Sequence, residues 1–154
     1  IVAAGLRPLF LFASCEPLVG DLGDLTPWMQ GDPYPQRLSD GETYRNGIKI
    51  GADGWPKLPA VAWWISGGET DQGAHKARPT HPGWFRSIRD QALDHGLAYH
   101  HKQNGEWVSV SEVAGPGTHF KFEDGATVRR IGKKLSGRTI DGVTHNAFPE
   151  VANG

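Results

Sequence analysis

The sequence predicts an α/β fold built on parallel strands, and three observations indicate it. Residues 60–66 form an apolar, β-branched and aromatic run that suits a strand buried on both faces. An amphipathic helical pattern follows, and a second strand-like run covers residues 97–101. This order is typical of a βαβ unit, in which ligand-handling residues gather where the strands end. We therefore look for function at the strand ends.

Composition narrows the class of protein. The 154 residues suffice for one domain with a hydrophobic core, and the net charge of −1 gives no global attraction to nucleic acid or membrane. The single cysteine, Cys15, excludes an internal disulfide and an all-cysteine metal site built from this chain alone. No apolar stretch approaches the roughly 20 residues of a membrane span. We expect a cytoplasmic protein, and the start at Ile1 indicates a fragment.

Before the βαβ unit, residues 9–13 form another continuous apolar run, predicted as a strand buried on both faces and ending just before Glu16. Residues 19–58 are rich in Gly, Asp and Pro and are predicted as a long insertion loop, with a short hairpin arm at 43–50.

Within the βαβ unit, Pro82 suits the first turn of the helix and Gly96 suits its end. Beyond the unit, residues 108–125 are predicted as a polar loop. Residues 126–149 are predicted as a hairpin tail that turns near residues 136–137. We expect a single domain over residues 1–154.

Charged residues follow three of these runs. Glu16, Glu69 and Lys102 would share one rim if the strands are parallel neighbours. Carboxylates beside a lysine can perform acid–base catalysis or hold an amino group of a ligand. The same three residues could instead form a structural ion-pair cluster.

Histidines and basic residues offer two further hypotheses. His100 and His101 are adjacent in a strand and point to opposite faces, so we predict no metal site. Residues 132–134 lack the spacing of a phosphate-binding loop. A basic cluster at residues 129–138 could contact nucleic acid or form a solvated edge.

A series of short motifs resembles a known family. The motifs are Ser14-Cys15-Glu16-Pro17-Leu18, Gly67-Gly68-Glu69-Thr70, Ala77-Arg78-Pro79, His81-Pro82-x-Trp84, residues 86–91, Lys102-Gln103, Gly105-Glu106-Trp107, residues 132–134 and Gly137-Arg138. In this order they resemble a phage-associated, radical-SAM-like family of unknown function, the mycobacteriophage gp-thirty-seven / gp-sixty-eight type, over roughly residues 9–149.

The resemblance implies a fold, a cofactor and a partner. The fold would be a partial parallel (β/α) barrel of radical-SAM or TIM type, with long loops and a C-terminal hairpin. This chain would be its C-terminal portion, and its partner would be a missing N-terminal barrel half. The full-length parent would use SAM and an iron–sulfur cluster, although this chain has one cysteine and holds no cluster by itself.

We therefore predict a portion of a radical-SAM-like enzyme that supplies substrate or SAM contacts at the barrel rim. The alternative is a non-catalytic module that binds nucleic acid or a partner through the basic 129–138 hairpin. The predicted catalytic residues are Glu16, Glu69 and Lys102. The predicted substrate- or cofactor-binding residues are Gly67, Gly68, Arg78, His81, Gln103, Glu106 and Trp107.

Overall fold

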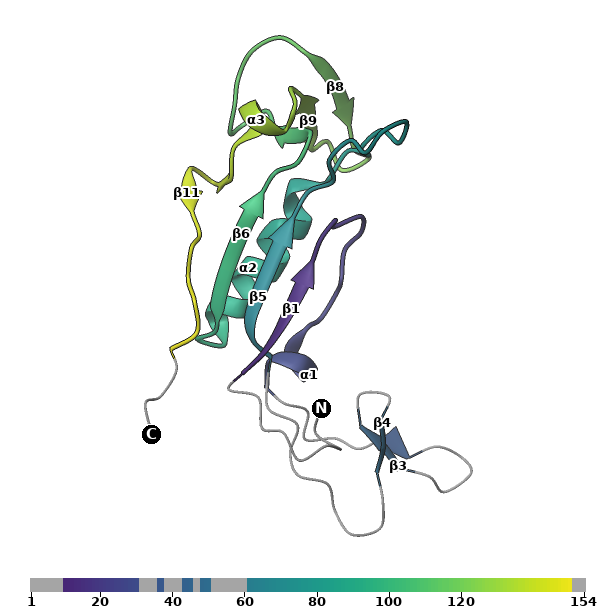
Figure 1. Cartoon of the computed structure of the whole chain (residues 1–154), viewed down its shortest axis with the longest axis vertical. Helices are drawn as coiled ribbons and strands as arrows, with labels where there is room; N and C mark the ends of the chain where they lie inside the picture. The colour runs from purple at the N-terminus through teal and green to yellow at the C-terminus, as the bar shows by residue number, and fades with distance from the viewer. Residues whose placement is uncertain (1–9, 31–35, 38–42, 46–47, 51–60, 151–154) are drawn as a thin grey trace.

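The computed structural model describes residues 10–30, 36–37, 43–45, 48–50 and 61–150 (Figure 1). The helices are α1 (Thr26–Met29), α2 (Pro82–Asp94) and α3 (Lys133–Ser136). The strands are β1 (Leu11–Cys15), β2 (Gln36–Arg37), β3 (Thr43–Arg45), β4 (Ile48–Ile50), β5 (Val61–Gly67), β6 (Ala98–Gln103), β7 (Trp107–Ser109), β8 (Thr118–Lys121), β9 (Thr127–Arg130), β10 (Thr139–Ile140) and β11 (Val143–Thr144).

A three-stranded parallel sheet is the centre of the fold. Strand β5 lies in the middle, with β1 on one side and β6 on the other. Helix α2 lies behind the sheet in Figure 1, on one of its two faces. Because the three strands run in the same direction, their carboxyl ends lie at one edge, beside the loops that carry the candidate site.

Helix α2 forms where the sequence predicts it, and the βαβ unit is confirmed. Pro82 occupies its first turn, and Nδ1 of His81 accepts a hydrogen bond of 3.0 Å from the Gly83 amide at the N-terminus. Its apolar side chains are buried at helical spacing against the sheet (Phe85, Ile88, Ala92). Gly96, with a φ of +66°, lets the chain leave the helix toward β6.

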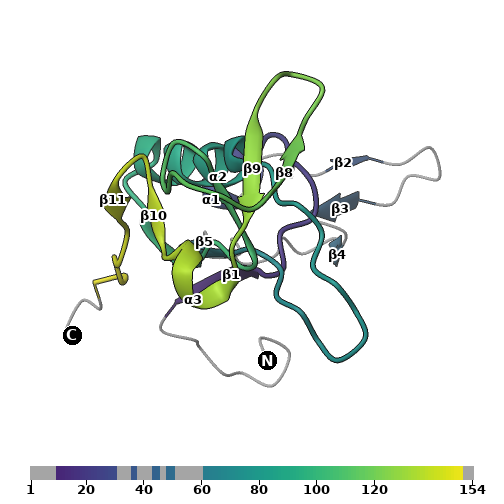
Figure 2. The ribbon, with the colours of Figure 1, turned by 90° about the horizontal axis from the view of Figure 1, so that it is seen from above.

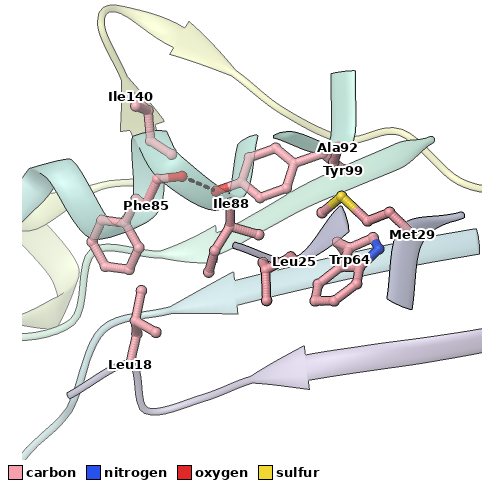
Figure 3. Close-up of a cluster of buried hydrophobic side chains, with 9 residues drawn as sticks. All are labelled: Leu18, Leu25, Met29, Trp64, Phe85, Ile88, Ala92, Tyr99 and Ile140. Carbon is pink, nitrogen blue, oxygen red and sulfur yellow. Dashed lines mark hydrogen bonds between the residues drawn. The ribbon is translucent and has the colours of Figure 1, made fainter. Parts of the chain in front are cut away.

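The main hydrophobic core lies between α2 and the sheet (Figure 3). It contains Leu18, Leu25, Met29, Trp64, Phe85, Ile88, Ala92, Tyr99 and Ile140. Leu25 and Met29 come from the segment predicted as an insertion loop, part of which therefore packs as core at α1 and the residue before it. The hydroxyl of Tyr99 donates to the Phe85 carbonyl oxygen at 3.3 Å, and Nε1 of Trp64 donates to the Val61 carbonyl at 3.0 Å, so both aromatic polar groups in this cluster are hydrogen-bonded.

The predicted partial (β/α) barrel is wrong. The parallel sheet ends at β6, because the C-terminal segment pairs with that strand in the antiparallel direction. The His101 amide donates to the His145 carbonyl at 3.1 Å, and the Ala147 amide donates to the Tyr99 carbonyl at 3.2 Å. After β6 the chain enters small antiparallel sheets rather than a further βα unit. The fold is mixed α/β.

The C-terminal half also differs from its prediction. Residues 108–125 contain β7 in part and β8, both of which pair with β9 in an antiparallel sheet. Residues 126–149 are not one hairpin that turns near 136–137, since β9 is followed by α3, and the hairpin within this range is formed by β10 and β11. Trp107 and Val128 are buried against Ala77 in a second, small core. Figure 2 looks down on this region, above the parallel strands.

Two further predictions concern the N-terminal half. The hairpin arm at 43–50 is confirmed by β3 and β4, while much of the predicted 19–58 loop lies outside the described residues. The expected burial of residues 9–13 on both faces is wrong, because Phe12 is 58% exposed on the face opposite α2. In the described part of the chain, no helix combines the length and the apolar character needed to cross a bilayer.

Candidate functional site

An ion pair spans the carboxyl end of the parallel sheet. Glu16 directly follows β1, and Lys102 lies near the end of β6, on the other side of β5. The Nζ of Lys102 donates to Oε2 of Glu16 at 2.8 Å. Both side chains therefore reach over the central strand, on the face that α2 leaves open.

Gly67, the last residue of β5, makes this crossing possible. A Cβ atom at position 67 would lie 2.3 Å from Oε1 of Glu16 and 2.9 Å from its carboxyl carbon. A side chain there would occupy the position of the carboxylate. Gly67 was predicted as a ligand contact. The structure gives a structural reason for a glycine at this position, which is that it leaves room for the Glu16 side chain.

The other carboxylate oxygen of Glu16 takes no part in this ion pair. Its Oε1 is buried and has no hydrogen-bond partner among the described residues. The Glu16 side chain as a whole is 18% exposed. Most buried polar atoms in proteins are hydrogen-bonded. A buried acceptor without a donor at the edge of a cleft therefore marks a position where a further hydrogen-bond donor fits.

The residues at the strand ends line an open cleft of about 560 Å³. Its lining comprises Glu16, Pro17, Gly68, Glu69, Thr70, Gln72, His75, Lys102, Gln103 and Lys133. The structure thus brings together five of the predicted site residues: Glu16, Gly68, Glu69, Lys102 and Gln103. Gln72, His75 and Lys133 were not among the predicted site residues, because they reach the cleft from a loop and from α3 and not from strand ends.

Glu69 is a buried and fully occupied carboxylate. Its Oε2 accepts from the backbone amide and Nε of Arg78 at 2.7 and 3.0 Å, and its Oε1 accepts from Nη2 of Arg78 at 2.8 Å. Nε2 of His75 lies 3.1 Å from the same Oε1. Hydrogen bonds from Arg78 lower the pKa of Glu69 to about 2, against the opposing effect of burial. This geometry favours an orienting role for Glu69 over the predicted catalytic one.

The two loops that follow β5 and β6 touch each other beneath the cleft. The Gly68 amide donates to the Gln103 carbonyl at 2.9 Å, and the Glu106 amide donates to the Glu69 carbonyl at 2.9 Å. A Cβ atom on Gly68 would lie 1.9 Å from the Asn104 carbonyl oxygen. The cleft floor therefore depends on close backbone contact at Gly68.

A buried polar chain runs under this floor. Oγ of Ser66 lies 2.7 Å from the Tyr99 hydroxyl and 2.9 Å from Nδ1 of His101. Nε2 of His101 lies 3.0 Å from Oδ1 of Asn104, whose Nδ2 donates to the Ser136 carbonyl at 2.9 Å. These partners assign a neutral His101 that donates from Nε2 and accepts at Nδ1. Burial lowers the pKa of His101 to about 4.

His100 and His101 do point to opposite faces, as the strand period predicts. His101 is fully buried toward α2, whereas the His100 ring contacts Trp63 and Phe148 on the open face. Among the described residues, no three His, Cys, Asp or Glu side chains gather as metal ligands.

The remaining predicted binding residues lie outside the cleft lining. Arg78 holds Glu69, and His81 caps α2 while its Nε2 lies 2.9 Å from Oδ2 of Asp124. Oε1 of Glu106 accepts from the Asp71 amide at 3.4 Å. Trp107 is buried in the second core, where its Nε1 donates to the Ala77 carbonyl at 2.9 Å. Arg78, Glu106 and Trp107 therefore hold the loop that follows β5, whereas His81 holds the N-terminus of α2.

The basic residues at 129–138 do not form one surface. Arg129 is 3% exposed and donates to the backbone carbonyls of residues 113, 114 and 116 at 2.8 to 3.0 Å. Arg130 donates to Oδ2 of Asp71 at 2.6 Å, and Lys133 lines the cleft. Arg138 donates to Oδ1 of Asn146, so three of the five cations between residues 129 and 138 are paired within the protein.

Comparison with known proteins identifies one family. A family model described as "Protein of unknown function (DUF5131)" matches residues 5–149. No curated protein and no solved structure matches the chain.

Proposed function

Because the chain belongs to DUF5131, a family described only as proteins of unknown function, we propose a function from the site itself. The cleft at the carboxyl end of β1, β5 and β6 binds a small polar ligand that donates a hydrogen bond to Oε1 of Glu16.

The unpartnered oxygen of Glu16 carries this proposal. A carboxylate oxygen that is removed from water and left without a donor costs free energy. The neighbouring Oε2 already has Lys102 at 2.8 Å, so the unsatisfied acceptor is confined to Oε1. A ligand ammonium, amine or hydroxyl in the cleft would supply the donor.

The charges around the cleft extend the description of the ligand. Lys102 and Lys133 line the cleft together with Glu16. Ammonium groups favour an anionic group on the ligand, as the carboxylate favours a cationic one. A zwitterion with both groups a few ångströms apart, as in an α-amino acid, matches this arrangement. Glu16 would orient its amino group, while Lys102 and Lys133 would hold its carboxylate.

The radical-SAM-like, phage-type character implied by the sequence motifs belongs to the same proposal. SAM carries an amino acid group, so the charges of Glu16, Lys102 and Lys133 fit it, and bound SAM would supply a reactive sulfonium. An iron–sulfur cluster does not fit the residues of this chain. Its only cysteine, Cys15, lies in β1, and burial raises the pKa of that thiol, whereas a cluster needs several thiolates.

Calorimetric titration of the chain with SAM and with L-methionine tests the proposal. We expect both to bind, and we expect Glu16→Gln and Gly67→Ala to weaken binding by about 10- to 100-fold, since a hydrogen bond to a charged group contributes roughly 1.5–3 kcal/mol. Gly20→Ala is the matched control, because a Cβ there meets nothing within 4 Å.

Two results would count against the proposal. One is the absence of binding by either zwitterion at millimolar concentration. The other is equal binding by the wild type and the two site variants. The alternative function, nucleic-acid binding through residues 129–138, would instead show oligonucleotide binding that weakens steeply with salt and depends on Lys134. The internal pairing of Arg129 and Arg130 counts against that alternative.

A further inference from the structure

We propose that His75 is the proton-transfer residue of the cleft and that Glu69 is its positioning residue. This inference rests on the proposed function, since it assigns a chemical role within the same ligand site. It replaces the predicted catalytic role of Glu69 with an assignment that the sequence spacing did not suggest.

A tight turn fixes His75 at the cleft. The Gln72 amide donates to the His75 carbonyl at 3.1 Å, and the His75 amide donates to the Gln72 carbonyl at 3.0 Å. Gly73, with a φ of +57°, occupies a backbone conformation that suits glycine within this turn. Both Gln72 and His75 line the cleft, and the His75 side chain is 55% exposed. The imidazole is therefore anchored by its backbone and open to a ligand.

The partner of Nε2 determines which ring nitrogen is free. Nε2 lies 3.1 Å from Oε1 of Glu69, a carboxylate that Arg78 keeps ionised. An ionised carboxylate only accepts hydrogen bonds, so Nε2 carries the proton in the neutral ring. Nδ1 then has a lone pair and can accept a proton. A carboxylate behind an imidazole also orients the ring and stabilises the imidazolium that forms.

Histidine is also the cleft residue type best suited to exchange a proton near neutral pH. The other ionisable side chains of the lining are two carboxylates and two ammonium groups, those of Glu16, Glu69, Lys102 and Lys133. Glu69 and Arg78 face His75 from its own loop, while the remaining three approach the cleft from β1, β6 and α3. In the step, an N–H or O–H bond of the ligand breaks, its proton forms an N–H bond at Nδ1, and the electron pair stays on the ligand atom; the imidazolium later returns the proton to the ligand.

Nitrogen-15 NMR of the whole chain, labelled at histidine, tests the assignment. We expect neutral His75 to be protonated at Nε2 alone, whereas the exposed His119 should show a mixture of tautomers. Glu69→Gln removes the charge and should shift His75 toward such a mixture. A neutral His75 protonated at Nδ1, or one unaffected by Glu69→Gln, would overturn the assignment.

A second measurement reports the reactivity of Nδ1 in the intact chain. Diethyl pyrocarbonate acylates a histidine nitrogen when the ring attacks one carbonyl; ethyl carbonate leaves and decomposes with the displaced proton to ethanol and carbon dioxide. Peptide mapping should show His75 reacting several-fold faster than His119, and Glu69→Gln should slow His75 alone. Equal rates at the two histidines would refute a role for Nδ1. Neither measurement uses a ligand, so failure here is distinguishable from failure of the SAM and methionine titrations.

Discussion

Gly68→Ala should lower the free energy of unfolding by about 3 kcal/mol, at the upper end of the range for added bulk in a packed interior. The new Cβ would lie 1.9 Å from the Asn104 carbonyl oxygen and 2.6 Å from its carbonyl carbon. Both atoms are backbone, so no side-chain rotation can relieve the overlap. The loops after β5 and β6 would have to separate, and with them the floor of the cleft. Urea denaturation monitored by tryptophan fluorescence measures the change.

Gly20→Ala provides the control for this substitution. It adds the same methyl group in open space, so its free energy of unfolding should stay within about 0.5 kcal/mol of the wild type. Equal stability of Gly68→Ala and Gly20→Ala would show that the two loops do not meet as closely as the structure has them.

The second large effect is a loss of stability in mild acid, caused by His101. Burial lowers its pKa from 6.5 to about 4 in the folded chain. Between these values the unfolded chain binds the proton and the folded chain does not, so protonation favours unfolding. Stability from this group is complete above pH 6.5 and is lost as the pH falls toward 4. The loss amounts to about 3 kcal/mol.

Urea titrations at several pH values would measure how the free energy of unfolding changes with pH. The pKa values of His100 and His145 are also lowered, chiefly by burial, so a comparison with His101→Gln is needed to isolate His101. The variant should flatten the pH dependence, whereas His119→Gln should leave it unchanged. If His101→Gln does not fold, NMR of the wild type still decides, since the His101 ring should stay neutral down to about pH 4. A ring that titrates near 6.5 would contradict the buried polar chain.

The βαβ unit could be predicted from sequence because its signals are local. Pro82 and Gly96 mark the ends of α2, and the apolar residues between them follow the helical period. The barrel was wrong because sequence patterns do not show where a sheet ends. The C-terminal segment has little strand character of its own, yet it pairs with the outer edge of β6 through residues 145–147. That pairing is a tertiary contact without a local sequence signal.

The candidate site could also be predicted only in part. Glu16, Glu69 and Lys102 were found because residues that follow neighbouring parallel strands must lie at one edge. His75 and Lys133 were missed because their position depends on how a loop and a short helix fold back over that edge. The signal that could have indicated His75 is the Gly73 turn, which brings it near Glu69 six residues earlier. Arg129 was misjudged as a surface cation because burial of an arginine against carbonyl oxygens has no sequence pattern.

A map of amide chemical-shift changes on titration with SAM tests most directly whether the cleft is the ligand site. If the cleft is the ligand site, the changes concentrate at residues 16–18, 67–75, 102–105 and 133, which line or adjoin the cleft. Gly67→Ala should then need about 10- to 100-fold more SAM to produce this pattern, whereas Gly20→Ala should titrate like the wild type. Changes centred elsewhere, such as on β8, or a Gly67→Ala variant that binds SAM as tightly as the wild type, would contradict a ligand site in the cleft.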